Sequence, residues 1–264
     1  MSASGAKKRF GQNFLHDKGV IARILQHVHA QPGEAVVEIG PGRGALTEGL
    51  IRSAGSVTAI EIDRDLIEAL RRRFGDALEL LVQDVLTVDF EQIAKVHGKK
   101  LRIVGNLPYN ISSPILFHLL PWASQVTDQT FMLQKEVVDR MVAAEGSKVY
   151  GRLSVMLQAR YTMERLFLVP PGAFFPAPAV DSAIVAMWPI PQEQCGVRDW
   201  AVFERLVADA FSSRRKMIRN TLAAYEGRLD LASAGVQETD RPEAISVESY
   251  MALANQLSSG TPLI

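Results

Sequence analysis

The segment Ile103-Val104-Gly105-Asn106-Leu107-Pro108-Tyr109-Asn110 joins a predicted strand to a rigid turn. The apolar run 101–104 is typical of a buried strand, which ends at Gly105. Pro108 fixes its own φ and pushes Leu107 toward an extended backbone. Because α/β proteins hold their ligands in the loops that follow the carboxyl ends of parallel strands, we expect a ligand site at this turn.

The same turn carries groups that suit a planar amine. The side-chain carbonyl of Asn106 and the backbone carbonyl of Leu107 are two hydrogen-bond acceptors, and the ring of Tyr109 offers a stacking face. Together they would fit adenine, whose exocyclic NH2 has two hydrogens to donate. A plain Asn-Pro turn with a surface tyrosine would look the same, so the rest of the chain must decide between the two interpretations.

Composition and charge limit the class of protein. The 264 residues are 47% hydrophobic and 22% charged, which is ordinary for a soluble globular protein with one large domain and room for a small one. No apolar run approaches the ~18 residues of a membrane span, and the N-terminus lacks the apolar core of a signal peptide. The five histidines and the single Cys195 show no metal-ligand spacing. We expect a cytoplasmic protein with no membrane and no metal partner.

A glycine-rich turn follows the strand predicted over 35–39. Its sequence is Gly40-Pro41-Gly42-Arg43-Gly44, and a helix follows to about residue 52. A strand, a glycine loop and a helix in this order bring backbone N–H groups close to a ligand. The dinucleotide fingerprint is GxGxxG, whereas the third glycine here comes one residue early and Glu38 stands two residues before the first. This spacing is more typical of a site for S-adenosylmethionine (SAM), with Gly40 and Gly42 as candidate contacts.

Acidic residues end the next two predicted strands, 56–60 and 78–82. Glu61 is placed to accept hydrogen bonds from both hydroxyls of a ribose, as the corresponding acid does in dinucleotide folds. Asp84 could accept from the amino group of a cofactor adenine, and the Val85 N–H could meet a ring nitrogen. An exposed acid at a strand end is the alternative for Glu61, but its position beyond the glycine loop favours a nucleoside.

The second half of the chain completes a sheet and then turns helical. Strands are predicted over 129–133, 161–169 and 183–188, and the proline-rich connector 170–182 holds Phe174 and Phe175 either as a stacking wall or as a core plug. Beyond a Pro-Ile-Pro linker, 200–257 contains only helical periodicities. We predict an α/β domain with a parallel sheet over 1–190 and a small helical domain over 191–264.

Two basic clusters stand out against a formal net charge of zero. The first is Lys7-Lys8-Arg9 in the N-terminal arm, 1–16. The second comprises Arg214, Arg215, Lys216 and Arg219. Clusters of this kind supply the phosphate contacts of nucleic-acid binders, and a solvated helix face is the alternative for the second.

Eight blocks of the sequence resemble one known family, the ribosomal RNA adenine dimethyltransferases, and within it the bacterial small-subunit enzymes. The blocks are GQNFL at 11–15, VVEIGPGRGALT at 36–47, EID at 61–63, QD at 83–84, GNLPYNISSPI at 105–115, YGRLSV at 150–155, FFPAPAVDS at 174–182 and FSSRRKMIRNTL at 211–222. They cover nearly the whole chain in the family's order, which is far more specific than a single glycine loop.

The resemblance implies a Rossmann-like methyltransferase domain, a helical C-terminal domain and SAM as the cofactor. It implies dimethylation of N6 on two adjacent adenosines near the 3′ end of 16S rRNA, within the small ribosomal subunit, and a role in ribosome biogenesis. Catalysis would fall to the turn Asn106-Leu107-Pro108-Tyr109 and to Phe174, which holds the family's aromatic position, whereas position 175 is not usually aromatic. The cofactor contacts implied by matching motifs are Asn13, Leu15, Gly40, Glu61, Asp84 and Asn106.

Two other functions stay open beside this one, and the glycine spacing disfavours a third, a nicotinamide dehydrogenase. A sister class methylates an adenosine of 23S rRNA and gives antibiotic resistance, but the Phe-Ser-x-Arg-Arg-Lys and FxPxPxVDS blocks favour the small-subunit enzyme. A largely non-catalytic assembly factor could bind immature small subunits through the C-terminal cluster, although the intact Asn-Leu-Pro-Tyr turn argues against binding alone. We expect a monomer.

Overall fold

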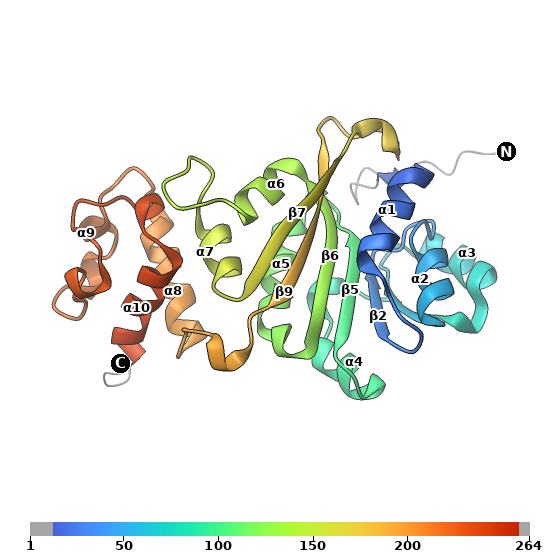
Figure 1. The fold of residues 1–264 in the computed structure, drawn as a ribbon, viewed down its shortest axis with the longest axis horizontal. Helices are drawn as coiled ribbons and strands as arrows, with labels where there is room; N and C mark the ends of the chain where they lie inside the picture. Colours follow the sequence, from blue (N-terminus) through green and yellow to red (C-terminus); the bar gives the residue numbers. More distant parts are fainter. Residues whose placement is uncertain (1–12, 259–264) are drawn as a thin grey trace. The chain divides into compact units, whose positions relative to one another are not determined.

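The computed structural model describes residues 13–258, which divide into two compact units. Within the described residues, the first unit comprises the chain up to Val138 together with Met163–Pro189 (Figure 1). The second comprises Asp139–Thr162 and the chain from Ile190 onward. No helix in the described part of the chain is both long enough and apolar enough to cross a membrane.

The first unit is built on a seven-stranded sheet with the order β4-β3-β2-β5-β6-β9-β7. The strands are β2 (Ala35–Ile39), β3 (Val57–Ile60), β4 (Leu78–Leu81), β5 (Leu101–Asn106), β6 (Val126–Gln134), β7 (Tyr161–Val169) and β9 (Ser182–Pro189). Strands β2 to β6 pair in parallel, and β9 runs antiparallel to β6. The predicted α/β class is confirmed, and β5 continues to Asn106, two residues beyond the predicted run.

Helices cover both faces of this sheet. The first face carries α1 (Lys18–Val28), α2 (Thr47–Ala54) and α3 (Arg64–Phe74), and the other carries α4 (Phe90–His97) and α5 (Ser112–Leu119). Figure 1 shows α1 in front of the sheet and α5 behind it. Right-handed crossovers put the connecting helices on one face while the chain moves in one direction along the sheet. After β4 the chain moves in the opposite direction, so the later helices lie on the other face. Residues of α1, α2 and α3 share one apolar core with Val36 of β2 and Val104 of β5.

The reversal creates a crevice between the carboxyl ends of β2 and β5. From β2 the chain moves outward to β3 and β4, whereas β5 lies on the opposite side of β2. The register places Ile39, the last residue of β2, opposite Gly105 of β5. Gly40 and Asn106 are the residues that follow this pair. Ligands of open α/β sheets bind at such a switch point, and here it joins the glycine loop to the Asn-Leu-Pro-Tyr turn.

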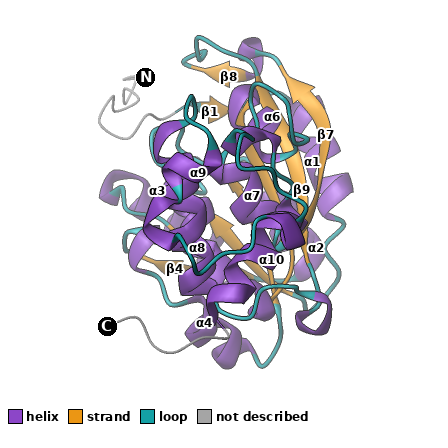
Figure 2. Cartoon of the chain, turned by 90° about the vertical axis from the view of Figure 1, so that its left-hand side faces the viewer, coloured by secondary structure: helices purple, strands orange, loops and turns teal. Residues whose placement is uncertain are grey.

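A separate two-stranded sheet joins segments far apart in the sequence. Strand β1 (Phe14–Leu15) lies antiparallel beside β8 (Phe174–Phe175), with Phe14 opposite Phe175 and Leu15 opposite Phe174 (Figure 2). Neither strand is predicted from the sequence. Because directly opposed side chains share a face, Leu15 and Phe174 both turn toward the core, where they are 7% and 3% exposed.

The second unit is helical. Its helices are α7 (Arg152–Gln158), α8 (Trp200–Ala210), α9 (Ile218–Thr221) and α10 (Val247–Ser258), and α6 (Lys135–Met141) leads into it from β6. The unit takes in 139–162, which the sequence places in the first domain. Hydrogen bonds explain this grouping, because the Tyr150 hydroxyl donates to the Ile245 carbonyl and Arg152 pairs with Glu204. The predicted boundary at 190/191 therefore marks where the chain enters this unit a second time.

The close approach of β2 and β5 makes a prediction about Gly105. A Cβ at this position would lie 2.7 Å from the Ile39 carbonyl oxygen, which is backbone and cannot move aside cheaply. We expect Gly105→Ala to lower the free energy of unfolding by about 1–3 kcal/mol, measured by urea denaturation. The control is Gly172→Ala, where a Cβ meets nothing within 4 Å, and it should change stability by less than about 0.5 kcal/mol. Equal stability of the two variants would contradict this role for Gly105.

Candidate active site

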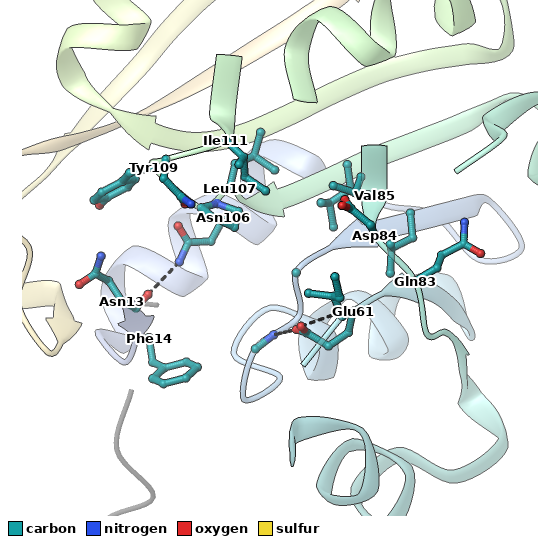
Figure 3. Close-up of a pocket in the computed structure, with 17 residues that line it drawn as sticks. Asn13, Phe14, Glu61, Gln83, Asp84, Val85, Asn106, Leu107, Tyr109 and Ile111 are labelled. Atoms are coloured by element: carbon teal, nitrogen blue, oxygen red, sulfur yellow. Dashed lines mark hydrogen bonds between the residues drawn. The ribbon is translucent and has the colours of Figure 1, made fainter. Parts of the chain in front are cut away.

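A cavity of about 250 Å³ opens at the crevice, and its walls come from the loops after β2, β3, β4 and β5 together with β1 (Figure 3). It brings together ten of the predicted site residues: Asn13, Gly40, Gly42, Glu61, Asp84, Val85, Asn106, Leu107, Pro108 and Tyr109. Sequence reasoning missed the other lining residues, among which are Phe14, Ile62, Gln83, Asn110 and Ile111. Across residues 13–258, no His, Cys, Asp or Glu side chains gather in threes as metal ligands would.

The glycine loop uses its N–H groups internally. Gly40 donates to the Ile60 carbonyl at 2.9 Å, and Gly42 donates to Oε2 of Glu61 at 3.4 Å. The φ angles of Gly40, Gly42 and Gly44 are +66°, +58° and +80°, which L side chains rarely adopt. The loop therefore differs from the expected donor loop: these two N–H groups hold the loop against β3 and Glu61, and its missing side chains leave the cavity open.

Glu61 is held in a fixed orientation at one side of the cavity. Its Oε1 accepts from the N–H groups of Ile62 and Asp63 at 2.9 and 2.8 Å, while Oε2 accepts from Gly42. Only 7% of the residue is exposed. Burial raises the pKa of this carboxyl above its usual value, and the three backbone donors act in the opposite direction. The result is a carboxyl group held in one orientation in the wall of the cavity.

A second buried acid, Glu38, lies beneath the glycine loop. It is 2% exposed, and its Oε2 accepts from the Thr47 hydroxyl at 2.6 Å. Burial raises the pKa of Glu38 to about 7, and the nearby charge of Glu61 adds to the shift. Glu38 also borders a smaller neighbouring cavity that it shares with Asn13 and Asn106. The predicted cofactor contact Leu15 lines this smaller cavity rather than the main one.

The amide of Asn106 has one defined orientation. Its Nδ2 donates to the backbone carbonyl of Asn13 at 3.1 Å, which leaves Oδ1 as the acceptor on the other side of the amide (Figure 3). The following residue, Leu107, donates its N–H to the Met132 carbonyl at 3.1 Å and so fixes the turn against β6. The turn is therefore held from two sides before any ligand binds.

Tyr109 is anchored through its hydroxyl. The oxygen lies 2.6 Å from Oγ of Ser182, a fully buried residue at the start of β9. Burial raises the pKa of the Tyr109 phenol. The group is therefore neutral near pH 7, and we interpret the ring as an aromatic wall rather than a base.

Asp84 and Val85 border the part of the cavity that follows β4. Oδ1 of Asp84 accepts from the Leu86 N–H at 3.0 Å and caps the short turn Val85–Thr87, so that one carboxylate oxygen fixes the loop. Val85 is 7% exposed and contributes an apolar wall. Both residues lie where the sequence predicts them.

The structure does not bring Phe174 to the cavity. Its ring is packed in the core with Leu15, 3% exposed, because the pairing of β1 with β8 turns both side chains inward. The expected stacking role of Phe174 therefore needs a correction: its ring has no open face in this structure. Phe14 is the aromatic residue that β1 contributes to the cavity, and the Arg43 guanidinium lies 4.4 Å from its ring centre.

The C-terminal basic cluster contains residues with different roles. Arg214 donates to the carbonyls of Lys148 and Tyr150 at 3.1 and 2.7 Å, so its guanidinium helps to hold a loop of the second unit. Arg219 lies 3.9 Å from Glu238. Arg215 and Lys216 are exposed. The other predicted cluster, Lys7-Lys8-Arg9, lies outside the described residues.

Comparison with known proteins identifies the family. Residues 3–259 match the family described as "Ribosomal RNA adenine dimethylase". The chain belongs to this family.

Relatives and solved structures agree with this membership. The chain is 51% identical over 263 residues to "Ribosomal RNA small subunit methyltransferase A" of Aromatoleum aromaticum, covering 99% of this chain and 98% of the relative. The structure of the 23S rRNA methyltransferase ErmE is similar, with a TM-score of 0.71 and 28% identity over 93% of this chain and all of the other. A dimethyladenosine transferase from Plasmodium falciparum has the same fold, with a TM-score of 0.78 and 24% identity, covering 93% of this chain and 98% of the other. The predicted family and the Rossmann-like methyltransferase fold are confirmed.

The raised pKa of Glu38 predicts how stability depends on pH. Between the usual pKa of 4.5 and the folded value of about 7, the unfolded chain ionises this group while the folded chain keeps it protonated. The free energy of unfolding therefore falls as pH rises through this window, and the loss persists at higher pH. Glu38→Gln keeps an acceptor for Thr47 but cannot ionise, so its stability relative to the parent should improve by up to about 3 kcal/mol between pH 4.5 and pH 8. Urea denaturation at both pH values tests this, and a pH-independent difference would contradict it.

Proposed function

We propose that this protein transfers methyl groups from SAM to N6 of two adjacent adenosines near the 3′ end of 16S rRNA in the small ribosomal subunit. The observation that carries the proposal is the oriented Asn106 amide, which lies in the same cavity as the fixed Glu61 carboxyl. Membership of the adenine dimethylase family and about 50% identity to small-subunit methyltransferases support this choice of substrate.

The cavity has groups that fit SAM. Glu61 would accept the ribose hydroxyls, and the oxygen of Asp84 that does not cap the Val85 turn would accept from the adenine amino group. Gly40 and Gly42 leave room for the sugar, and Asn13 and Leu15 border the smaller cavity that adjoins Asn106. When bound, SAM supplies an electrophilic methyl group on a positively charged sulfur.

The Asn-Leu-Pro-Tyr turn would prepare the amine. The N6 lone pair of adenine is delocalised into the ring, which makes N6 a poor nucleophile. Oδ1 of Asn106 and the carbonyl of Leu107 would accept its two hydrogens, favour a pyramidal nitrogen and stabilise the positive charge that develops there. The ring of Tyr109 would stack on a base that has left its helix, so that much of the rate comes from alignment. On transfer the sulfonium would become the neutral thioether of S-adenosylhomocysteine, and the methylated N6 would lose one proton to water. One N6 hydrogen then remains, and the base must rotate about C6–N6 or rebind before the second transfer.

Binding of SAM should depend on the oriented carboxyl group. We expect Glu61→Ala to weaken SAM binding by about 1–3 kcal/mol in calorimetry, because it removes the acceptors of both ribose hydroxyls. Glu68→Ala is the matched control, since that acid is 71% exposed on α3, and it should leave the affinity unchanged within about twofold. If Glu61→Ala binds SAM as tightly as the parent, the ribose assignment is wrong.

The reaction itself can be mapped. The protein should transfer radiolabelled methyl from SAM to undermethylated small subunits, and mass spectrometry should find dimethyladenosine at two adjacent positions near the 3′ end of 16S rRNA. Label on 23S rRNA would instead support the large-subunit alternative. Tight binding to small subunits without any transfer would support a non-catalytic assembly factor.

Recognition of the small subunit should involve Arg215 and Lys216 rather than Arg214, whose guanidinium already donates to two backbone carbonyls. We expect the double change Arg215→Ala and Lys216→Ala to weaken small-subunit binding and to lower its salt slope by roughly one unit for each phosphate that the variant no longer neutralises. SAM affinity should stay within about twofold in the double variant.

Arg214→Ala should instead lower stability, because it removes the donor to the carbonyls of Lys148 and Tyr150. An unchanged salt slope in the double variant would mean that this surface is only solvated. The arm Lys7-Lys8-Arg9 is proposed as the second contact.

A further inference from the structure

Phe175 is an exposed aromatic residue next to the cavity. It lies on β8 directly opposite Phe14, so the two side chains share one face of the small sheet. The ring of Phe14 lines the cavity, whereas Phe175 does not line it and is 65% exposed. An exposed phenyl ring therefore stands beside the site but outside it.

The backbone that carries this ring is fixed on both sides. β8 is paired to β1, and the carbonyl of Asp181 at the far end of the connector accepts from the Lys135 N–H at 2.9 Å. The next residue, Ser182, contacts the Tyr109 hydroxyl at 2.6 Å. The connector is thus tied to the same turn that would hold the target base. A ring on a fixed backbone loses little conformational entropy when it binds a partner.

We propose that Phe175 stacks on an RNA base that neighbours the target adenosine. This inference rests on the proposed function, because it concerns the substrate of the same site. A base stacked on Phe175 stays outside the cavity, while the target base enters beside Tyr109. Stacking suits this position because every base offers a π face, and exposed aromatic rings are the usual platform for single-stranded nucleic acid. The Arg43 guanidinium, stacked on Phe14 across the small sheet, adds positive charge near the RNA backbone.

A single exposed apolar side chain needs no explanation by itself. The position of Phe175 sets it apart, because Phe14, the residue directly opposite it in the small sheet, is part of the cavity wall. The connector exposes a second apolar side chain, Val180, which is 46% exposed. An unpaired RNA segment entering the cavity would meet this surface, so we commit to a nucleobase as the occupant rather than to a second protein chain.

The test compares variants of Phe175 in the full-length protein. The probe is undermethylated small subunits, and the readouts are binding affinity, methyl transfer and SAM affinity by calorimetry. Phe175→Ala should weaken subunit binding roughly tenfold or more, Phe175→Tyr should restore it to within about threefold, and Phe175→Leu should behave like the alanine variant because it keeps bulk without a ring. Trp188→Ala is the control: this exposed aromatic residue lies at the other end of β9, near the start of β6. It should bind like the parent, and all variants should keep SAM affinity within about twofold.

Several outcomes would overturn the stacking role. If Phe175→Ala binds small subunits as tightly as the parent, Phe175 has no stacking role. If Phe175→Leu does so, the side chain contributes apolar packing rather than stacking. If Trp188→Ala loses as much subunit affinity as Phe175→Ala, the contact is not specific to Phe175. Self-association of the parent that is abolished in Phe175→Ala, with subunit binding unchanged, would assign the ring to a second copy of the chain. Failure of the parent itself to methylate small subunits would count against the proposed function, whereas the ratio of variant to parent affinity tests only Phe175.

Discussion

The site depends on how closely β2 and β5 approach at the switch point of the sheet. The register sets Ile39 opposite Gly105, and only a glycine fits beside the Ile39 carbonyl. Because the next residues are Gly40 and Asn106, this close approach puts a residue without a side chain against an amide acceptor. Both proposed ligands, the nucleoside cofactor and the target amine, need that juxtaposition. The position of the chemistry therefore follows from strand pairing.

The electrostatics of the crevice suit a cation. Glu38 and Glu61 are both buried there, and burial raises the pKa of each carboxyl. Glu61 lines the main cavity, where the described lining residues include no Lys or Arg, whereas Glu38 borders the smaller cavity, which Arg43 also lines. A ligand with a positively charged sulfur would favour the ionised carboxylates and would offset the free energy that their burial costs. The same crevice would be a poor site for a pyrophosphate, which agrees with the glycine spacing.

Sequence reasoning succeeded where the signal is local. Strand ends, the glycine loop and the acids that follow the strands could be read from short stretches, and the structure gathers Glu61, Asp84 and Asn106 around one cavity. It failed where an interaction joins distant segments. Two-residue strands have no periodicity, so nothing in the sequence showed that pairing with β1 would bury Phe174 and expose Phe175. Likewise the cluster at 214–219 looked uniform, because the carbonyls that Arg214 binds belong to residues far away in the sequence.

The Asn106 amide, oriented by the Asn13 carbonyl, is the group that we propose holds the reacting amine. Single-turnover methyl transfer to undermethylated small subunits at saturating SAM tests it directly. We expect Asn106→Ala to slow transfer on the order of 10²- to 10³-fold with the fold intact. Asn110→Ala, which removes an exposed amide from the same cavity, should change the rate by less than about threefold. A near-parental rate for Asn106→Ala at saturating SAM would contradict this role of the amide.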